Sequence, residues 1–294
     1  MLYFWSMKAN IPVYDICSLT NNSKNDILIS RFAEYLSVHK NLFIPHKHSF
    51  YHLVYFTQGG GSQTIDFEYV AVKPHQIYFM IPGQVHNWNF EGPVDGYIIN
   101  FSATFFQSFL LKAGYLDELP FFSGIVGDSV IDIPTGMQNL ITGLFEDLVK
   151  ESDSVQLLKA DMIRATLLKL LIAVARLGNQ HQNVPTYNYT LLRNFQKLIE
   201  KNYTTLKLPK EYAELLFITP NHLNALCSAM LGIPAGEVIR NRIALEAKRL
   251  LINRELGVAE IADQLNFADN SYFTKFFKKQ AGVTPEEFRK NNHN

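Results

Sequence analysis

The chain has 294 residues, which is long enough for two domains that each bury a core of their own. Its 27 basic and 27 acidic side chains give a formal net charge of zero, so the overall composition does not indicate a nucleic-acid partner. Its two cysteines, Cys17 and Cys227, exclude a disulfide framework, and without a secretion signal or a membrane-spanning run we expect a soluble, cytoplasmic protein.

Residues from about 27 to 101 contain short runs of β-branched and aromatic side chains. The runs read ILISRF, YHLVYF, SQTIDF, YVAV, QIYFMI and GYIINF, and turn residues such as Gly59 to Gly61, Pro74 and Gly83 separate them. Many short strands at this spacing predict an antiparallel sandwich or barrel.

Two segments of this region resemble the two motifs of the cupin superfamily. They are HKHSFYH, which precedes a glycine turn, and IPGQVHNW, which follows a strand. We expect His46 and His48 on the same strand face, because side chains alternate with a period of two. In metal-binding cupins a carboxylate follows such a pair by four residues. Here His52 occupies that position, and His86 matches the histidine of the second motif.

The four histidines allow two interpretations. Four imidazoles could bind a divalent transition metal. The missing carboxylate departs from the enzyme pattern and favours histidines that line a pocket or bond to one another. Aromatic side chains with polar tips in the same region suit a small ring such as a sugar or an aromatic acid. The sequence therefore predicts an effector site with no metal and no cofactor, formed by His46, His48, His52, Tyr55, Tyr78, His86 and Trp88.

After Phe101 the apolar spacing becomes that of helices, with one buried stripe between Met137 and Leu148. The segment from Ser154 to Leu177 carries two apolar faces. A helix of this kind needs two partners, so we expect a dimerisation helix, with packing inside one domain as the alternative. One face is a heptad-like seam of Ile163, Leu167, Leu170, Val174 and Leu177, and the other is a patch of Leu158, Met162, Ala165 and Ile172.

The polar segment from Gly178 to Pro185 predicts an interdomain linker. Charge is distributed unevenly around it. From Thr190 onward the chain has 15 Lys and Arg against 11 Asp and Glu, whereas the preceding residues have 12 against 16. This asymmetry is typical of a DNA-binding domain joined to a domain with another role.

Beyond the linker the pattern predicts a first helix-turn-helix unit. A helix from Tyr189 to Tyr203 is followed by one from Leu208 to Leu216. Thr219 caps the next helix, which reads TPNHLNALCSAMLG. Pro234 to Leu251 then predicts a rigid connecting helix.

A second unit follows in VAEIADQLNFADNSYFTKFFKKQAGVTPEEFR. Asn266 tolerates the left-handed conformation of a helix end, and Asp269 or Asn270 caps the helix that follows. With the preceding ALEAKRLL, this stretch resembles the signature of the AraC/XylS family of bacterial transcription regulators, which ends in the Gly-x-x-Pro turn found here at Gly282 to Pro285. The resemblance implies a cupin-like effector domain and two helix-turn-helix units that enter successive major-groove segments.

The resemblance also indicates which side chains face DNA. Family members commonly carry arginine at the position of Ala225 and lysines near Ser228 and Ala229, so we expect the first recognition helix to bind more weakly than the second. For Arg242 the alternative to a DNA contact is a salt bridge with Glu246. The predicted DNA-binding residues are Asn221, His222, Asn224, Arg242, Asn270, Ser271, Thr274, Lys275, Lys278 and Lys279.

The sequence therefore predicts an α+β protein of two domains. The first domain, residues 1–178, is a cupin-like β-barrel with dimerisation helices in its part from about residue 104. A linker spans 179–187, and an all-α tandem helix-turn-helix domain spans 188–294. We expect that the protein is not an enzyme but a homodimeric transcription regulator. Its expected partners are a double-stranded DNA operator, a small-molecule effector and RNA polymerase, and no membrane. The alternatives are a metal-dependent cupin enzyme fused to a DNA-binding module, and an effector-free regulator whose cupin is only a dimerisation scaffold.

Overall fold

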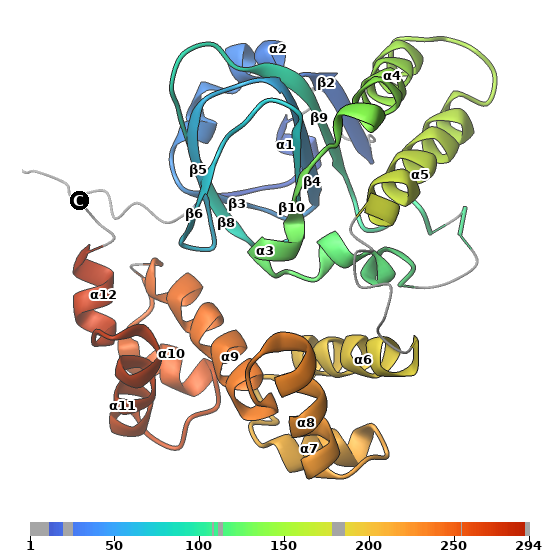
Figure 1. Ribbon diagram of the computed structural model, residues 1–294. Helices are drawn as coiled ribbons and strands as arrows, with labels where there is room; N and C mark the ends of the chain where they lie inside the picture. The colour runs from blue at the N-terminus through green and yellow to red at the C-terminus, as the bar shows by residue number, and fades with distance from the viewer. Residues whose placement is uncertain are drawn as a thin grey trace, which may run out of the picture. The chain divides into compact units, whose positions relative to one another are not determined.

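The computed structural model describes residues 12–19, 26–107, 109–110, 114–177, 186–253 and 255–291. They form two compact units, one within Pro12–Gln182 and one within Asn183–Asn294 (Figure 1). The first unit combines two sheets with helices, and the described part of the second is helical, so the predicted α+β class is confirmed. In the described parts of the chain, no helix combines the length and apolar composition needed to cross a membrane.

Two five-stranded sheets face each other in the first unit (Figure 1), with strand orders β1-β3-β8-β5-β6 and β10-β7-β4-β9-β2. The strands are β1 (Val13–Tyr14), β2 (Ile27–Arg31), β3 (His46–His48), β4 (Tyr51–Gln58), β5 (Gly61–Ile65), β6 (Glu68–Ala71), β7 (Gln76–Met80), β8 (Val85–Phe90), β9 (Asp95–Phe101) and β10 (Val130–Asp132). Strands β1, β8 and β10 lie outside the predicted runs, because β1 has only two residues, β8 carries asparagine at alternate positions and β10 has only three residues.

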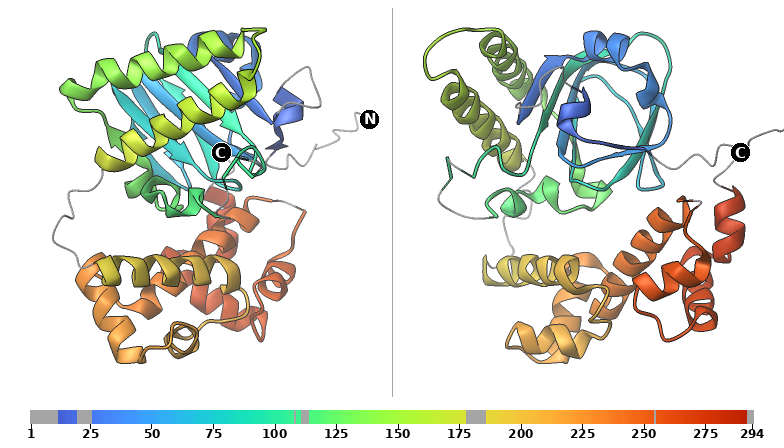
Figure 2. Two further views of the ribbon diagram at one scale, coloured as in Figure 1. Left: turned by 90° about the vertical axis from the view of Figure 1, so that its right-hand side faces the viewer. Right: turned by 180° about the vertical axis from the view of Figure 1, so that it is seen from behind.

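The sheet that contains β4 is buried on both faces. Val54 and Phe56 pack between the two sheets with Trp88. Leu53 and Tyr55 point the other way, into the core formed with helices α4 (Thr135–Ser152) and α5 (Lys159–Leu177), which lie across that face (Figure 2). Burial on both sides explains why these strands are nearly continuous apolar runs instead of alternating ones.

Helix α5 buries only one of its two apolar faces. Its seam of Ile163, Leu167, Leu170 and Val174 belongs to the core shared with α4 and the sheet. In the second patch Leu158 and Met162 remain 66% and 56% exposed, Ala165 is exposed and Ile172 is half-buried. The helix begins at Lys159, later than predicted, because Leu158 has a φ of 62° and lies outside the helical region. The short helices of this unit are α1 (Ile16–Leu19), α2 (Phe32–Val38), η1 (Lys40–Phe43), η2 (Leu116–Glu118), η3 (Pro120–Phe122) and α3 (Val126–Ser129).

Seven helices form the described part of the second unit. They are α6 (Thr186–Asn202), α7 (Pro209–Leu215), α8 (Pro220–Leu231), α9 (Ala235–Leu251), α10 (Val258–Gln264), α11 (Asn270–Ala281) and α12 (Pro285–Asn291). The pairs α7–α8 and α10–α11 are helix-turn-helix units, and α9 connects them and packs against both (Figure 2). The predicted linker lies outside the described residues, except that Thr186 and Tyr187 belong to α6.

Local capping fixes where the two recognition helices begin. The Thr219 hydroxyl accepts a hydrogen bond of 3.1 Å from the backbone N–H of His222, at the start of α8. The Asp269 carboxylate accepts one of 2.7 Å from the N–H of Tyr272, which identifies Asp269 as the cap of α11. Asn266, in the turn before α11, has the predicted left-handed conformation, with a φ of 53°.

Candidate DNA-binding surface and interior polar cluster

Helix α11 presents a polar outer face. Phe273 and Phe277 are buried within the unit, which fixes the rotation of the helix about its axis. The predicted DNA-contacting residues Asn270, Ser271, Lys275, Lys278 and Lys279 are exposed, and Thr274 is half-exposed. Amide and hydroxyl groups at the N-terminal end, followed by lysines, are suited to base edges and phosphates in a major groove.

Helix α8 has fewer polar and charged side chains on its outer face than α11, and one of its predicted DNA contacts forms a hydrogen bond within the unit. Asn221 and His222 are exposed at its N-terminal end. The side-chain oxygen of Asn224 accepts a hydrogen bond of 3.1 Å from the N–H of Ala235, the first residue of α9. Because the amide oxygen that would accept from adenine already accepts this bond, Asn224 caps the start of α9 in this arrangement.

For Arg242 the structure shows the alternative to a DNA contact, a salt bridge with Glu246, and adds a second acidic partner. Its guanidinium donates to Glu200 of α6 at 2.8 Å and to Glu246 at 3.0 Å, and it lies 4.0 Å from the centroid of the Tyr203 ring. Burial alone would lower the pKa of Arg242, but the two carboxylates raise it above its ordinary value. Only 14% of the side chain is exposed, so Arg242 ties α6 to α9 and is not available to DNA in this arrangement.

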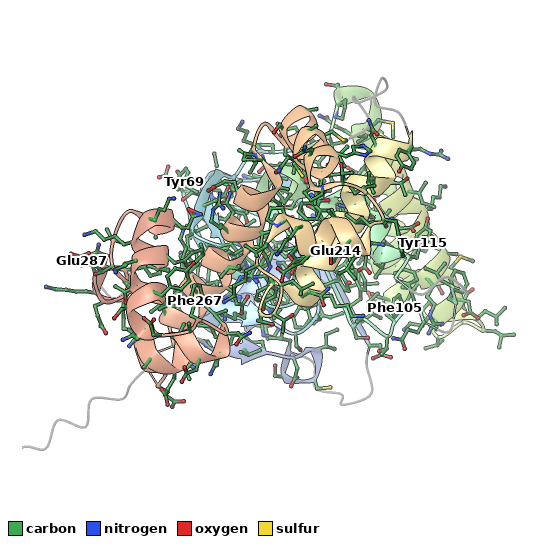
Figure 3. All side chains as sticks on the ribbon, turned by 90° about the horizontal axis from the view of Figure 1, so that it is seen from below. Tyr69, Phe105, Tyr115, Glu214, Phe267 and Glu287 are labelled. Atoms are coloured by element: carbon green, nitrogen blue, oxygen red, sulfur yellow. The ribbon has the colours of Figure 1, made fainter. Side chains whose placement is uncertain are left out.

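Lys207 links the two helix-turn-helix units, a role that no sequence pattern indicated. Its Nζ donates to the backbone oxygens of Leu265, at 2.8 Å, and of Asn266, at 2.5 Å, in the turn of the second unit. The same nitrogen lies 3.7 Å from the centroid of the Phe267 ring, which is labelled in Figure 3. Burial lowers the pKa of Lys207 to about 8. No local motif separates Lys207 from an ordinary surface lysine.

The facing surfaces of the two sheets bring together most of the predicted effector-binding residues. His46 pairs with His86 across β3 and β8, and Gln63 pairs with Trp88 across β5 and β8. In the other sheet His52 of β4 lies opposite an asparagine of β9. We call the following buried residues the interior polar cluster: His46, His48, His52, Gln63, Tyr78, His86, Trp88 and Asn100.

One half of the cluster is an ordered chain of hydrogen bonds. The Trp88 indole N–H donates to the Tyr78 oxygen at 3.0 Å, and the Tyr78 hydroxyl lies 3.0 Å from His52 Nε2. His52 Nδ1 lies 2.7 Å from the side-chain oxygen of Asn100. Because the amide oxygen only accepts, Nδ1 carries the proton, and Nε2 accepts from the tyrosine hydroxyl. Both nitrogens of His52 are therefore occupied.

The other half consists of His46, His48 and His86. His46 Nδ1 donates to the backbone oxygen of Ile44 at 2.7 Å, and the Nε2 atoms of His48 and His86 lie 2.8 Å apart. Burial lowers the pKa of His46 to about 4 and that of His52 to about 3, and it holds the pKa values of His48 and His86 well below their usual range. All four imidazoles are therefore neutral at neutral pH.

Tyr55 does not join this cluster. It lies on the opposite face of β4, where its ring stacks on Phe145 of α4 with 5.2 Å between centroids. The structure does not bring Tyr55 together with the other predicted effector contacts, because His52 and Tyr55 are an odd number of residues apart on β4 and so point to opposite faces. The prediction also missed Gln63 and Asn100. Asn100 follows Ile98 by two residues in β9, so the period of two places both on the same face of this strand.

Both units match models of known protein families. Residues 30–171 match the AraC-like ligand binding domain, and residues 212–291 match a helix-turn-helix domain. These two matches correspond to the unit with the interior polar cluster and the unit with the two helix-turn-helix pairs.

Several known proteins resemble the chain. It is 23% identical over 268 residues to the uncharacterized HTH-type transcriptional regulator YfiF of Bacillus subtilis, covering 89% of this chain and 84% of YfiF. The uncharacterized transcriptional regulatory protein YesN of B. subtilis is 38% identical over 79 residues, which are 26% of this chain and 22% of YesN. A solved structure of ToxT from Vibrio cholerae aligns over 90% of this chain and 97% of ToxT, with 13% identity and a TM-score of 0.43. Since an AraC-type ligand-binding domain and a helix-turn-helix domain match in succession, the chain belongs to the AraC family of DNA-binding transcription regulators.

Proposed function

We propose that this regulator engages its operator with both helix-turn-helix units at once. The observation that supports this proposal is the packing of α9 against both units, together with the exposed polar ends of α8 and α11. A rigid connector sets the separation of the two recognition helices, so each reads its own major-groove segment. Asn221 and His222 act from α8, while Asn270, Ser271, Thr274 and Lys275 read bases from α11 and Lys278 and Lys279 contact phosphates.

Selection of binding sites from random duplex DNA tests this proposal. We expect an enriched sequence with two conserved blocks about one helical turn apart. The block read by α11 should be the better defined, because α8 has Ala225, Ser228 and Ala229 where charged side chains would contact phosphates. Recovery of a single block, or of no preference at low salt, would contradict the proposal.

The effector of the N-terminal domain is proposed to be a small polar molecule that binds at the interior polar cluster. The ring faces of Trp88 and Tyr78 and the buried imidazoles suit a sugar or an aromatic acid. Binding changes transcription through different affinity for different arrangements of the DNA-binding domain. A thermal-shift screen of sugars and aromatic acids tests this, since a ligand specific to the folded state raises the melting temperature. Loss of the shift in Trp88→Phe would assign it to the cluster.

A homodimer formed through α5 is proposed from the exposed patch of Leu158 and Met162. Met162→Lys should convert the dimer to a monomer in light scattering, while Lys73→Ala, a change at an exposed position between β6 and β7, should not. A monomeric wild-type protein at micromolar concentration would exclude this role. We also propose that the regulator acts in the cytoplasm, through contact with RNA polymerase and without enzymatic activity.

A further inference from the structure

Three histidines of the interior polar cluster converge at one point. One ring nitrogen of each of His46, His48 and His86 lies within 4.8 Å of the other two. The ring centroids are 4.7 Å apart for His46 and His48, 4.1 Å for His46 and His86, and 4.9 Å for His48 and His86. The pairing of β3 with β8 enforces this arrangement, because His46 lies directly opposite His86.

The three imidazoles have unused nitrogen atoms. His46 Nε2, His48 Nδ1 and His86 Nδ1 are buried with no hydrogen-bond partner among the described residues. Leaving such atoms unpaired in a core costs free energy. The Nε2 atoms of His48 and His86 bond only to each other, and His46 Nε2 has no partner among the described residues, so these three Nε2 atoms are the candidates for binding a common ion. At His46 the bond from Nδ1–H to the Ile44 oxygen leaves Nε2 as a bare lone pair, which is the usual outer-shell arrangement of a metal-binding histidine.

His52 is excluded from this set although it lies nearby. Its ring centroid is 4.9 Å from that of His48, but Asn100 and Tyr78 occupy both of its nitrogens. The structure therefore separates the four histidines into three whose Nε2 atoms have no partner outside the three among the described residues, and one whose two nitrogens are held by other side chains.

We propose that His46, His48 and His86 bind one divalent transition-metal ion of the zinc class. Three neutral imidazoles suit zinc, cobalt, nickel or copper, whereas magnesium and calcium require oxygen ligands. In tetrahedral coordination with bonds of about 2.0–2.1 Å, ligand nitrogens lie about 3.3 Å apart. The Nε2 atoms of His48 and His86, now 2.8 Å apart, separate slightly. The ring that carries its proton on Nε2 moves that proton to its own Nδ1, and the metal then replaces the bond between the two Nε2 atoms. A fourth position remains for water or an effector atom, so the metal-free expectation for this site is revised.

Metal binding to the full-length protein tests this proposal directly. After treatment with a chelator, the protein should bind one Zn2+ per chain in equilibrium dialysis at about 10 µM free metal. Co2+ should give the visible absorption bands of a tetrahedral nitrogen site. His46→Gln and His86→Gln should each weaken binding at least about tenfold. His52→Gln is the matched control and should leave the metal affinity unchanged, because His52 supplies no ligand.

Absence of stoichiometric Zn2+, or equal loss of affinity in His52→Gln and His86→Gln, would overturn the proposal. If a variant does not fold, as judged by circular dichroism, X-ray absorption on zinc-loaded wild-type protein decides. Three imidazole nitrogens at about 2.0–2.1 Å support the site, and any other first shell rejects it. Because these experiments measure metal binding and not DNA binding, a negative result would not count against the proposed operator binding.

Discussion

The side-chain nitrogen of Lys207 lies 2.8 Å from the backbone oxygen of Leu265, so the residue that precedes the first helix-turn-helix unit holds the turn of the second. The two residues are 58 positions apart in the sequence. This bond makes the separation of the two units depend on more than the connecting helix.

Replacing Lys207 with methionine should loosen the turn from Leu265 to Phe267. The aliphatic stem remains, but the hydrogen bonds from a charged donor are lost, at a cost of about 1–2 kcal/mol. Hydrogen exchange should become faster in this turn, and operator affinity should fall severalfold. Lys210→Met, a change on α7, is the control and should alter neither quantity. Unchanged exchange in Lys207→Met would show that the contact contributes no stability.

Lys275 and Lys278 should differ in what they contribute to DNA binding. Lys278→Ala should reduce the slope of log affinity against log salt by about 1, because it removes a phosphate contact. Lys275→Ala should reduce discrimination at one base pair by about 1–3 kcal/mol. Fluorescence anisotropy with the selected operator and single-base variants measures both. Lys150→Ala on α4 removes the same charge outside the helix-turn-helix domain and should change neither quantity.

Arg242→Met should destabilise the C-terminal unit without changing the salt dependence of DNA binding. Removing the guanidinium leaves Glu200 and Glu246 facing each other, at a cost of about 2 kcal/mol after allowing for the partial exposure of Glu200. Urea unfolding measures the loss, and a second change, Glu200→Gln, should restore part of it. A reduced salt slope with unaltered stability would instead support a DNA contact.

Cys17 and Cys227 should react very differently with thiol reagents. Burial raises the pKa of Cys227 to about 11, so at pH 8 only about one molecule in a thousand carries the reactive thiolate. Cys17 is exposed. Ellman's reagent should therefore titrate one thiol quickly in the native protein and two in urea. Cys17→Ser should remove the fast reaction, and two fast thiols in the native wild type would contradict the burial of Cys227.

Phe217→Gly should stabilise the first helix-turn-helix unit. Phe217 has a φ of 55° in the turn before α8 and is 96% exposed. A left-handed backbone costs a bulky residue about 1–2 kcal/mol, and glycine avoids this while giving back about 0.5–1 kcal/mol in chain entropy. We expect a net gain of about 0.5 kcal/mol in the free energy of unfolding. Asn266→Gly, at the equivalent turn, should gain less, because asparagine tolerates this conformation.

The features that the sequence predicted correctly are those that depend on neighbouring residues. The caps at Thr219 and Asp269 and the left-handed Asn266 involve partners within four residues. Apolar periodicity likewise located most strands and the seam of α5. The assignment of the chain to its family followed from a local signature in the second helix-turn-helix unit.

Other features depend on partners that only the fold brings together. Arg242 meets Glu200 from 42 residues away, and Asn224 meets the start of α9 from 11 residues away. The sequence indicates neither of these distant partners, although the spacing of four residues within α9 did indicate the salt bridge of Arg242 with Glu246. The separation of His52 from the other three histidines has the same origin, since Asn100 lies 48 residues further along the chain.

Strand β4 separates the interior between the two sheets from the core beneath α4 and α5, and its successive residues point alternately to the two sides. His52 lies on one side of it, among the histidines, and Leu53 lies on the other, in the core beneath α4 and α5. Adjacent residues share a peptide plane, so a displacement of His52 moves Leu53 with it. If the proposed effector binds in the interior and displaces His52, the displacement would reach the core beneath α4 and α5 through this strand, with no hinge or loop in between.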